Sequence, residues 1–393
     1  MDIDGTQLNR TVAILGSGPI GLEAALAAGE AGLGASVVEA GDQIAAGVRS
    51  WGHVRMFSPW RMNTSERGRK LVGLDVDLDA CPTGHELCDH YLDPLAEKLS
   101  VDTGRRVAAV SKATLNKYDA IGDGPTRAAD AFRVLLETAH GEMLMESDIV
   151  FDCTGSYGAA NARWAGTGGM PAVGERAARE AGVVETVIPD FEARRDDFAG
   201  KHVILAGKSY SAMTALRALA DVGVAHVHWI VRDGQPLAAT EGDPLDVRSG
   251  LVNFAADLLQ NPPSWLTVHA GHAIELMRPN FDGTPIAVYL GGNKEIRADK
   301  LLSLVGYRPD ESLWKHLQVH QCYATTGPMK LAATLLGETD CMTAGQGNTP
   351  DVMLNPEPNF FVLGSKSYGT NSAFLLQTGL KQIDDVLSLL ASD

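Results

Sequence analysis

The first forty residues alternate between apolar and mixed stretches in an order that predicts a strand, a helix and a second strand. Residues 11–15 form a short apolar run that predicts a buried strand. Residues 20–30 are rich in Ala and Leu, with Gly29 as the only breaker beyond Gly21 of the turn, and predict a helix. Residues 35–38 predict another strand, and Glu39 follows its end. This order is typical of a βαβ unit with a parallel sheet.

The same order returns near the middle of the chain, as an internal repeat. HVILAG predicts a strand, KSYSAMTALRALADVG a turn and a helix, and HVHWIVRDG a second strand ending at Arg232. A last long helix is expected to start near Asn371 or Ser372. Further strands are predicted by the apolar runs at 147–153, 300–305 and 360–363. The pattern predicts an α/β protein with two Rossmann-like domains, each a doubly wound sheet in three layers.

Glycines at G-x-G-x-x-G spacing occupy the turn after the first strand. Gly16 permits a tight turn, Gly18 lets a pyrophosphate approach the backbone, and Gly21 lets the helix pack close to the strand. The helix N-terminus would face the phosphates, and Glu39 is placed to accept hydrogen bonds from a ribose. A carboxylate there disfavours a 2′-phosphate, so FAD or NAD is the expected ligand. The remaining residues of this predicted cofactor site are Pro19, Ile20 and Ala40. The alternative is an ordinary glycine-rich strand–turn–helix.

The turn of the second repeat departs from the glycine pattern. Gly207 is present, but Ser209 stands where the second glycine would be, and Arg232 occupies the place of Glu39. An Arg at that place can pair with a 2′-phosphate, which indicates NADP(H). The alternative for Arg232 is a solvated charge at a strand end. The remaining residues of this predicted site are Lys208, Tyr210 and Ser211.

Composition excludes several classes of partner. The net charge of −16 argues against nucleic acid or an anionic membrane surface. No apolar run is long enough to span a membrane, and the acidic, polar first ten residues do not resemble a signal peptide. The five Cys are an odd number without a C-x-x-C pair, which suits a reducing compartment. We therefore expect a cytoplasmic protein whose partner is a small-molecule substrate.

Residues 41–70 contain a segment rich in Trp and Arg that has no clean period. Such a loop beside a nucleotide-binding fold often lines a site, and an anionic substrate could bind there through Arg49, Arg55 or Arg61. The alternative is a surface loop held down by its aromatic side chains, Trp51, Phe57 and Trp60.

The stretch CPTGHELCDH raises the separate question of a metal site. Thr83 and Glu86 have capping-box spacing and predict a helix that runs to about Leu99. Since this helix accounts for the segment and the spacing matches no standard zinc pattern, we expect no metal. The candidate ligands would have been Cys81, His85, Cys88 and His90.

Five blocks in this order resemble the two-dinucleotide-binding-domain flavoproteins. They are GSGPIG with Glu39, DCTG at 152–155, GKSYSA with Arg232, GYRP at 306–309 and FFVLGSKSYG at 360–369. The resemblance implies that the first repeat and the C-terminal segment bind FAD, with the NAD(P)-binding domain inserted between them. It implies FAD contacts at Thr154, Gly155, Gly364, Ser365, Asn371 and Ser372. The implied division is 1–160 and 301–393 for the FAD domain and 161–300 for the NAD(P) domain.

Within this superfamily the sequence looks more like the flavin-containing monooxygenases than the disulfide reductases, because no redox-active Cys pair is visible. The resemblance places Asn63 beside the flavin, with Trp60 nearby, where it would position a C4a-hydroperoxide or the nicotinamide. The group's F-x-G-x-x-x-H-x-x-x-W/Y signature is absent, and Ser365 replaces the usual Asp. The expected function is an NADPH-dependent FAD monooxygenase that oxygenates N or S of a small molecule. A reductase or dehydrogenase without a stable hydroperoxide, and a flavin- or nucleotide-binding redox sensor, remain as alternatives.

Overall fold

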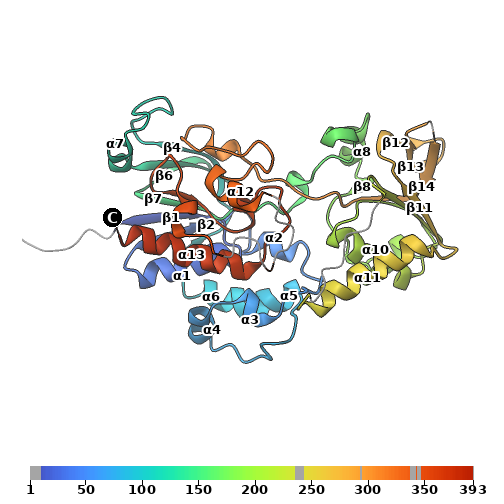
Figure 1. Cartoon of the computed structure of the whole chain (residues 1–393), viewed down its shortest axis with the longest axis horizontal. Coiled ribbons are helices and arrows are strands. Elements are labelled where there is room, and N and C mark those ends of the chain that lie inside the picture. Colours follow the sequence, from blue (N-terminus) through green and yellow to red (C-terminus); the bar gives the residue numbers. More distant parts are fainter. Residues whose placement is uncertain (1–9, 235–242, 293, 337–341, 343–346, 393) are drawn as a thin grey trace, which may run out of the picture. The chain divides into compact units, whose positions relative to one another are not determined.

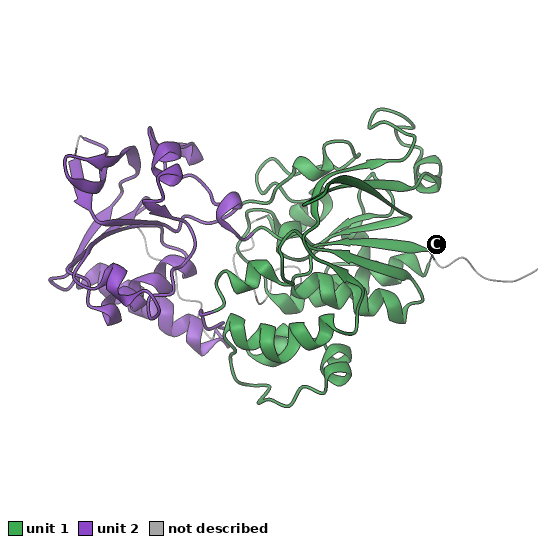
Figure 2. Ribbon diagram, turned by 180° about the vertical axis from the view of Figure 1, so that it is seen from behind, with its two compact units in different colours: residues 1–52, 58–156, 308–393 green, residues 53–57, 157–307 purple. Residues whose placement is uncertain are grey.

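The computed structural model describes residues 10–234, 243–292, 294–336, 342 and 347–392. The chain divides into two compact units, coloured separately in Figure 2. Unit 1 comprises residues 1–52, 58–156 and 308–393, and unit 2 comprises residues 53–57 and 157–307. Unit 2 is therefore inserted into unit 1 along the sequence. Among the helices in the described ranges, none combines the length and apolarity that a membrane span requires.

Unit 1 is built on a five-stranded parallel sheet with the strand order β16-β7-β1-β2-β3. The helices α1 (Pro19–Glu30) and α13 (Leu376–Leu390) lie side by side below this sheet (Figure 1). Alternate residues such as Ala13, Leu15 and Val150 point to the other face, where they share a core with Val110 and Phe132 of a second sheet. The strands of the parallel sheet are β1 (Thr11–Leu15), β2 (Gly34–Val38), β3 (Val101–Asp102), β7 (Ile149–Asp152) and β16 (Phe360–Val362).

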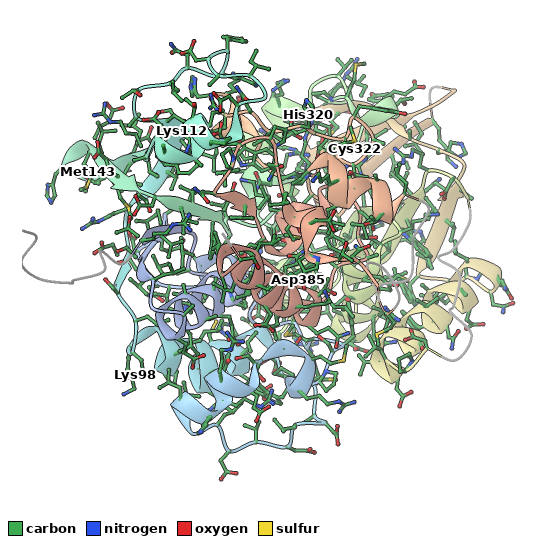
Figure 3. All side chains as sticks on the ribbon, turned by 60° about the vertical axis from the view of Figure 1, so that its left-hand side comes forward. Lys98, Lys112, Met143, His320, Cys322 and Asp385 are labelled. Atoms are coloured by element: carbon green, nitrogen blue, oxygen red, sulfur yellow. The ribbon has the colours of Figure 1, made fainter. Side chains whose placement is uncertain are left out.

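The second sheet of unit 1 is antiparallel, in the order β4-β5-β6. Met143 of its outer strand β6 is labelled in Figure 3 and is exposed to solvent. Lys112 of β4, also labelled there, is buried, and its Nζ lies 3.5 Å from the ring centroid of Phe132. The elements of this layer are β4 (Arg106–Lys112), α7 (Gly124–Ala129), β5 (Phe132–Thr138) and β6 (Gly141–Ser147).

The helix predicted from Thr83 to Leu99 is shorter and less regular than expected. The capping box is confirmed, because Thr83 Oγ1 accepts from the Glu86 N–H and Glu86 Oε2 accepts from the Thr83 N–H. Pro94, however, has no N–H to donate to the turn before it, and a π-helical turn at Cys88–Leu92 precedes it. The short helices of unit 1 are α2 (Ala46–Arg49), α3 (Trp60–Asn63), α4 (Glu66–Val72), α5 (Gly84–Leu87), α6 (Asp93–Ala96) and α12 (Met329–Leu335).

Unit 2 repeats the plan of unit 1 with a five-stranded parallel sheet in the order β11-β10-β9-β15-β8. Its core is formed between this sheet and the helices α10 (Tyr210–Val222) and α11 (Asp246–Gln260). On the other face, Ile204 and Ile230 pack against Ile286 and Val288 of an antiparallel meander. The strands of the parallel sheet are β8 (Val184–Glu185), β9 (His202–Ala206), β10 (His226–Val231), β11 (Leu266–Ala270) and β15 (Lys300–Ser303).

The meander of unit 2 runs in the order β12-β13-β14. Its strands are β12 (Ile274–Phe281), β13 (Thr284–Leu290) and β14 (Lys294–Ala298), and the short helices are α8 (Glu175–Glu180) and α9 (Arg195–Phe198). Sheet, helices and meander thus give each unit the three layers predicted for it, and the expected α/β class is confirmed.

Candidate functional site: two nucleotide cradles

The turn between β1 and α1 requires glycine at two positions for reasons internal to the protein. Gly16 has φ +96°, and a Cβ there would lie 2.8 Å from the Cys153 carbonyl oxygen. A Cβ on Gly21 would lie 1.9 Å from the Gly16 carbonyl oxygen, so the helix could not pack where it does. Gly18 has an ordinary extended backbone, and no protein atom lies within 4 Å of an added Cβ. The missing side chain at Gly18 therefore leaves room for a ligand rather than for the protein.

Glu39 is held rigidly at the end of β2. Its Oε2 accepts from the Ser17 N–H at 2.9 Å and from the Ser17 hydroxyl at 2.7 Å, while Oε1 accepts from the Gly41 N–H at 2.9 Å. The side chain is buried, and Ala40 beside it is exposed. A carboxylate offers about four acceptor sites and three are already engaged, so Oε1 of the fixed carboxylate keeps acceptor capacity for one ribose hydroxyl.

A buried ion pair ties together the two turns that follow β7 and β16. Lys366 Nζ lies 2.7 Å from Asp152 Oδ2 and 2.8 Å from Thr154 Oγ1, and Lys366 and Asp152 are both fully buried. Asp152 Oδ2 also accepts from the Trp314 indole N–H at 2.6 Å, and Oδ1 accepts from the N–H and hydroxyl of Thr154. Sequence reasoning missed Lys366, Asp152 and Trp314, because their partners lie far apart along the chain.

The same two turns present their glycines at the carboxyl edge of the sheet. Gly155 and Gly364 have φ +70° and +71°, a region that favours glycine. The Ser156 and Ser365 hydroxyl oxygens lie 3.4 Å apart, so the two predicted FAD-contacting segments meet there. The edge of a parallel sheet where its strands end is the usual place for a nucleotide.

The last helix begins later than predicted, at Leu376 rather than near Asn371 or Ser372. Asn371 Oδ1 accepts from the Ala373 N–H at 2.9 Å, and this local turn competes with a helix at that point. The first turn of α13 still reaches the first turn of α1, because a Cβ on Gly379 would lie 2.5 Å from Ile20 Cδ1. Ile20 also lies within van der Waals distance of the Cβ position of Gly364. Two helix N-termini, each with partial positive charge, therefore meet at this edge.

The predicted flavin-side residues Asn63 and Trp60 are both buried in α3. Asn63 Oδ1 accepts from the Ser58 hydroxyl at 2.7 Å, and Nδ2 donates to the Ser58 carbonyl at 2.8 Å. The amide thus holds its own turn closed and retains one N–H for another partner.

The arginines proposed for an anionic substrate differ in their surroundings. Arg49 pairs with Asp93 at 2.5 Å and also donates to the Ile44 carbonyl, and Arg61 pairs with Asp79. Arg55 is exposed and belongs to unit 2. Arg49 and Arg61 therefore meet their own carboxylates rather than an open site.

The cysteines among the described residues form no disulfide. Burial raises the pKa of the Cys88 thiol to about 11, and burial and then Asp152 raise that of Cys153 well above its usual value. A raised pKa disfavours the thiolate form that disulfide exchange requires. Burial opposes ionisation of Cys322 too, but hydrogen bonds from Thr325 and the Ala324 backbone outweigh it and lower its pKa.

Unit 2 contains a cavity of about 150 Å³ at the carboxyl ends of β9, β10 and β15. Gly207 at its base has φ +125°, and a Cβ there would lie 2.2 Å from the Leu304 carbonyl oxygen, so Gly207 repeats the role of Gly16. Ser209 has φ −73° and ψ 175°, against −68° and −179° for Gly18, and each residue caps its helix. The lost glycine therefore leaves the backbone of the turn unchanged.

Cations dominate the charged side chains that line this cavity, which are Arg163, Lys208, Arg232 and one carboxylate, Asp233. Arg232 is exposed, and Lys208 Nζ lies 2.5 Å from Asp233 Oδ2. Ser209 also lines the cavity, while Tyr210 and Ser211 begin α10, and the Tyr210 ring lies 5.4 Å from that of Phe57. The structure thus brings Gly207, Lys208, Ser209 and Arg232 together around one cavity.

No protein-family model and no curated protein matches this sequence. Among solved structures, the bacillithiol disulfide reductase of Bacillus cereus is similar with 19% identity and a TM-score of 0.72, over 98% of this chain and 99% of that one. Thioredoxin reductase from Lactococcus lactis has 15% identity and a TM-score of 0.62, over 98% of each chain. The ornithine N-hydroxylase of Kutzneria sp. 744 has 17% identity and a TM-score of 0.60, over 98% of this chain and 99% of that one. The chain therefore has the fold of the two-dinucleotide-binding-domain flavoproteins, a fold that both reductases and monooxygenases adopt.

Proposed function

We propose that this protein is an FAD-dependent oxidoreductase that takes its electrons from NADPH. Each unit has one nucleotide cradle, which is the glycine turn together with the residue after the second strand: Gly16–Gly21 with Glu39, and Gly207–Ser209 with Arg232. The observation that carries the proposal is the opposite charge of these two cradles. The first ends in the fixed carboxylate of Glu39, which suits the ribose hydroxyls of FAD. The second ends in Arg232, which suits the 2′-phosphate of NADP. The similar Kutzneria ornithine N-hydroxylase was solved with reduced FAD, NADP⁺ and L-ornithine together, which supports this pair of cofactors.

The residues of unit 1 fit FAD on structural grounds. The space beside Gly18 and the N-terminus of α1 would receive the pyrophosphate, and Glu39 would hold the adenosine ribose. The turns at Thr154–Gly155 and Gly364–Ser365 would line the middle of the cofactor, and α13 would direct its positive end at the ring. When bound, the flavin supplies hydride and oxygen chemistry, and the protein supplies orientation and the exclusion of water.

We further propose that the protein is a monooxygenase acting on N or S of a small molecule. Among the described residues the cysteines form no disulfide, and burial raises the pKa of Cys88 and Cys153, so we take oxygen rather than a protein dithiol as the electron acceptor. One observation favours a reductase or dehydrogenase instead. The Asn63 amide, expected beside the flavin, has both its oxygen and one N–H engaged with Ser58. Stopped-flow absorbance decides between the two.

The purified protein is first loaded with FAD and reduced with NADPH without oxygen, then mixed with oxygen. A long-lived near-ultraviolet absorbance without the visible flavin bands is expected for a monooxygenase. Immediate return of the oxidised spectrum would contradict it and favour the reductase or dehydrogenase. Failure of NADPH and NADH to reduce bound FAD would favour a redox sensor, and failure to bind FAD would overturn the whole proposal.

A further inference from the structure

In both repeats the residue after the first glycine of the turn contacts a carboxylate just beyond the second strand, and this geometry points to a second residue of the cofactor site. In each repeat the residue after the first glycine reaches the residues that follow the second strand. In the first repeat Ser17 donates to Glu39 through both its N–H and its hydroxyl. In the second repeat Lys208 reaches across to Asp233, directly after Arg232. Position two of the turn therefore contributes to the ribose end of each cradle.

The residue at this position meets a carboxylate in both repeats, Glu39 in the first and Asp233 in the second, but its own charge differs. Ser17 is fully buried and its hydroxyl donates to Glu39, so the first repeat presents only the carboxylate, which matches a hydroxyl of an unmodified ribose. Lys208 and Arg232 present two cations, and Asp233 cancels one of them. The second ribose end thus carries a net charge of about +1 where the first carries about −1. A 2′-phosphate is attracted by the second arrangement and repelled by the first.

We infer that Lys208 is a specificity-determining residue that binds the 2′-phosphate of NADPH together with Arg232. This inference rests on the proposed function, since it assigns a residue to the NADPH site. Asp233 holds the Lys208 ammonium at the cavity, where an ammonium with three N–H donors can also reach phosphate oxygens. The competing explanation is that Lys208 and Asp233 form an ordinary surface ion pair, which contributes little to stability and nothing to ligand choice.

The test measures binding rather than turnover, by isothermal titration calorimetry on the whole FAD-loaded chain. The two probes are adenosine 2′,5′-bisphosphate and 5′-AMP, which differ only in the 2′-phosphate. We expect Lys208→Gln to weaken binding of the bisphosphate about tenfold or more and to leave 5′-AMP binding unchanged. Lys208→Arg should recover most of the lost affinity.

The matched control is Lys201→Gln, which removes the same charge at the opposite, amino end of β9, where Lys201 is exposed. Equal effects of Lys208→Gln and Lys201→Gln on bisphosphate binding would overturn the inference. If the wild-type protein binds both probes with equal affinity, the 2′-phosphate site is refuted while nucleotide binding stands. If it binds neither probe, the proposed NADPH site fails and the inference fails with it. Circular dichroism of each variant verifies that the fold is retained.

Discussion

Replacing Lys366 by Met tests whether the buried ion pair with Asp152 supports unit 1. Met keeps much of the length of the side chain but removes the ammonium, so the Asp152 carboxylate stays buried without its cation. Removing one partner of a buried pair costs about 3–5 kcal/mol. Asp152 retains the Thr154 N–H, the Thr154 hydroxyl and the Trp314 indole as donors. We therefore expect a loss near the lower end, about 3 kcal/mol of unfolding free energy.

The chain offers a matched control in Lys381, whose Nζ lies 2.6 Å from Asp385 Oδ2 on the outer side of α13. Asp385 is labelled in Figure 3, and the Lys381 side chain is 51% exposed. The distance is close to the 2.7 Å of the Lys366 pair, but the Lys381 side chain is half exposed and the Lys366 side chain is fully buried. Lys381→Met should therefore cost less than about 1 kcal/mol. The comparison separates the effect of burial from the effect of pairing.

The assay must report on unit 1 alone, because a chain with two compact units need not unfold in one step. Hydrogen exchange resolved by mass spectrometry, on peptides that cover β7 and β16, gives the opening free energy of this sheet. Equal losses in Lys366→Met and Lys381→Met would refute the reasoning. A second check is the double variant Asp152→Asn with Lys366→Met, which removes both charges and should restore part of the loss.

Three further outcomes are expected. Gly18→Ala should fold normally but bind FAD at least tenfold more weakly, whereas Gly21→Ala should destabilise unit 1 by several kcal/mol. The reason is that a Cβ on Gly21 collides with the protein and a Cβ on Gly18 does not. Flavin titration measures the first effect and hydrogen exchange the second, and equal behaviour of both variants would be evidence against our account of the turn. Ser209→Gly should change NADPH affinity less than about threefold, measured by calorimetry, because the backbone there is already extended. Burial and neighbouring charges, His226 for one and Lys294 for the other, lower the pKa of His228 and His269 from 6.5 to about 4. Both are neutral when folded above about pH 4, so the unfolded chain binds more protons between pH 6.5 and 4, and unit 2 loses stability as the pH falls through that window. The two shifts taken in full correspond to about 7 kcal/mol, and because solvent screens these partly exposed rings we expect a loss of about 2 kcal/mol. Exchange in β10 that does not change with pH, once intrinsic rates are corrected, would contradict this.

The sequence alone predicted the parts of the site that local pattern controls. A strand, a glycine turn and a helix are encoded within about thirty residues, so both cradles and the contrast between Glu39 and Arg232 were visible. The capping box at Thr83 and Glu86 is equally local and was confirmed. These features depend on residues that are close together along the chain, so the sequence is sufficient to predict them.

The remaining features depend on contacts that spacing does not reveal. Lys366 and Asp152 are more than two hundred residues apart in sequence, and no local pattern around either residue predicts that they form an ion pair. Strand β6 shows no clear alternation in the sequence, because the apolar Met143 and Leu144 are exposed and precede Met145, which packs against the core. The start of α13 was placed too early because the side chain of Asn371 closes a turn of its own.

The near-identical backbone angles of Gly18 and Ser209 bear on how such proteins are recognised. A pattern that demands glycine at the second position would pass over residues 207–212, although their turn has the same shape. The three glycines of the motif record three different constraints. The first is set by a torsion angle, the third by helix–strand distance, and the second by the outline of what binds. A serine at the second position is therefore compatible with the same turn, and substitution there need not cost the protein its fold.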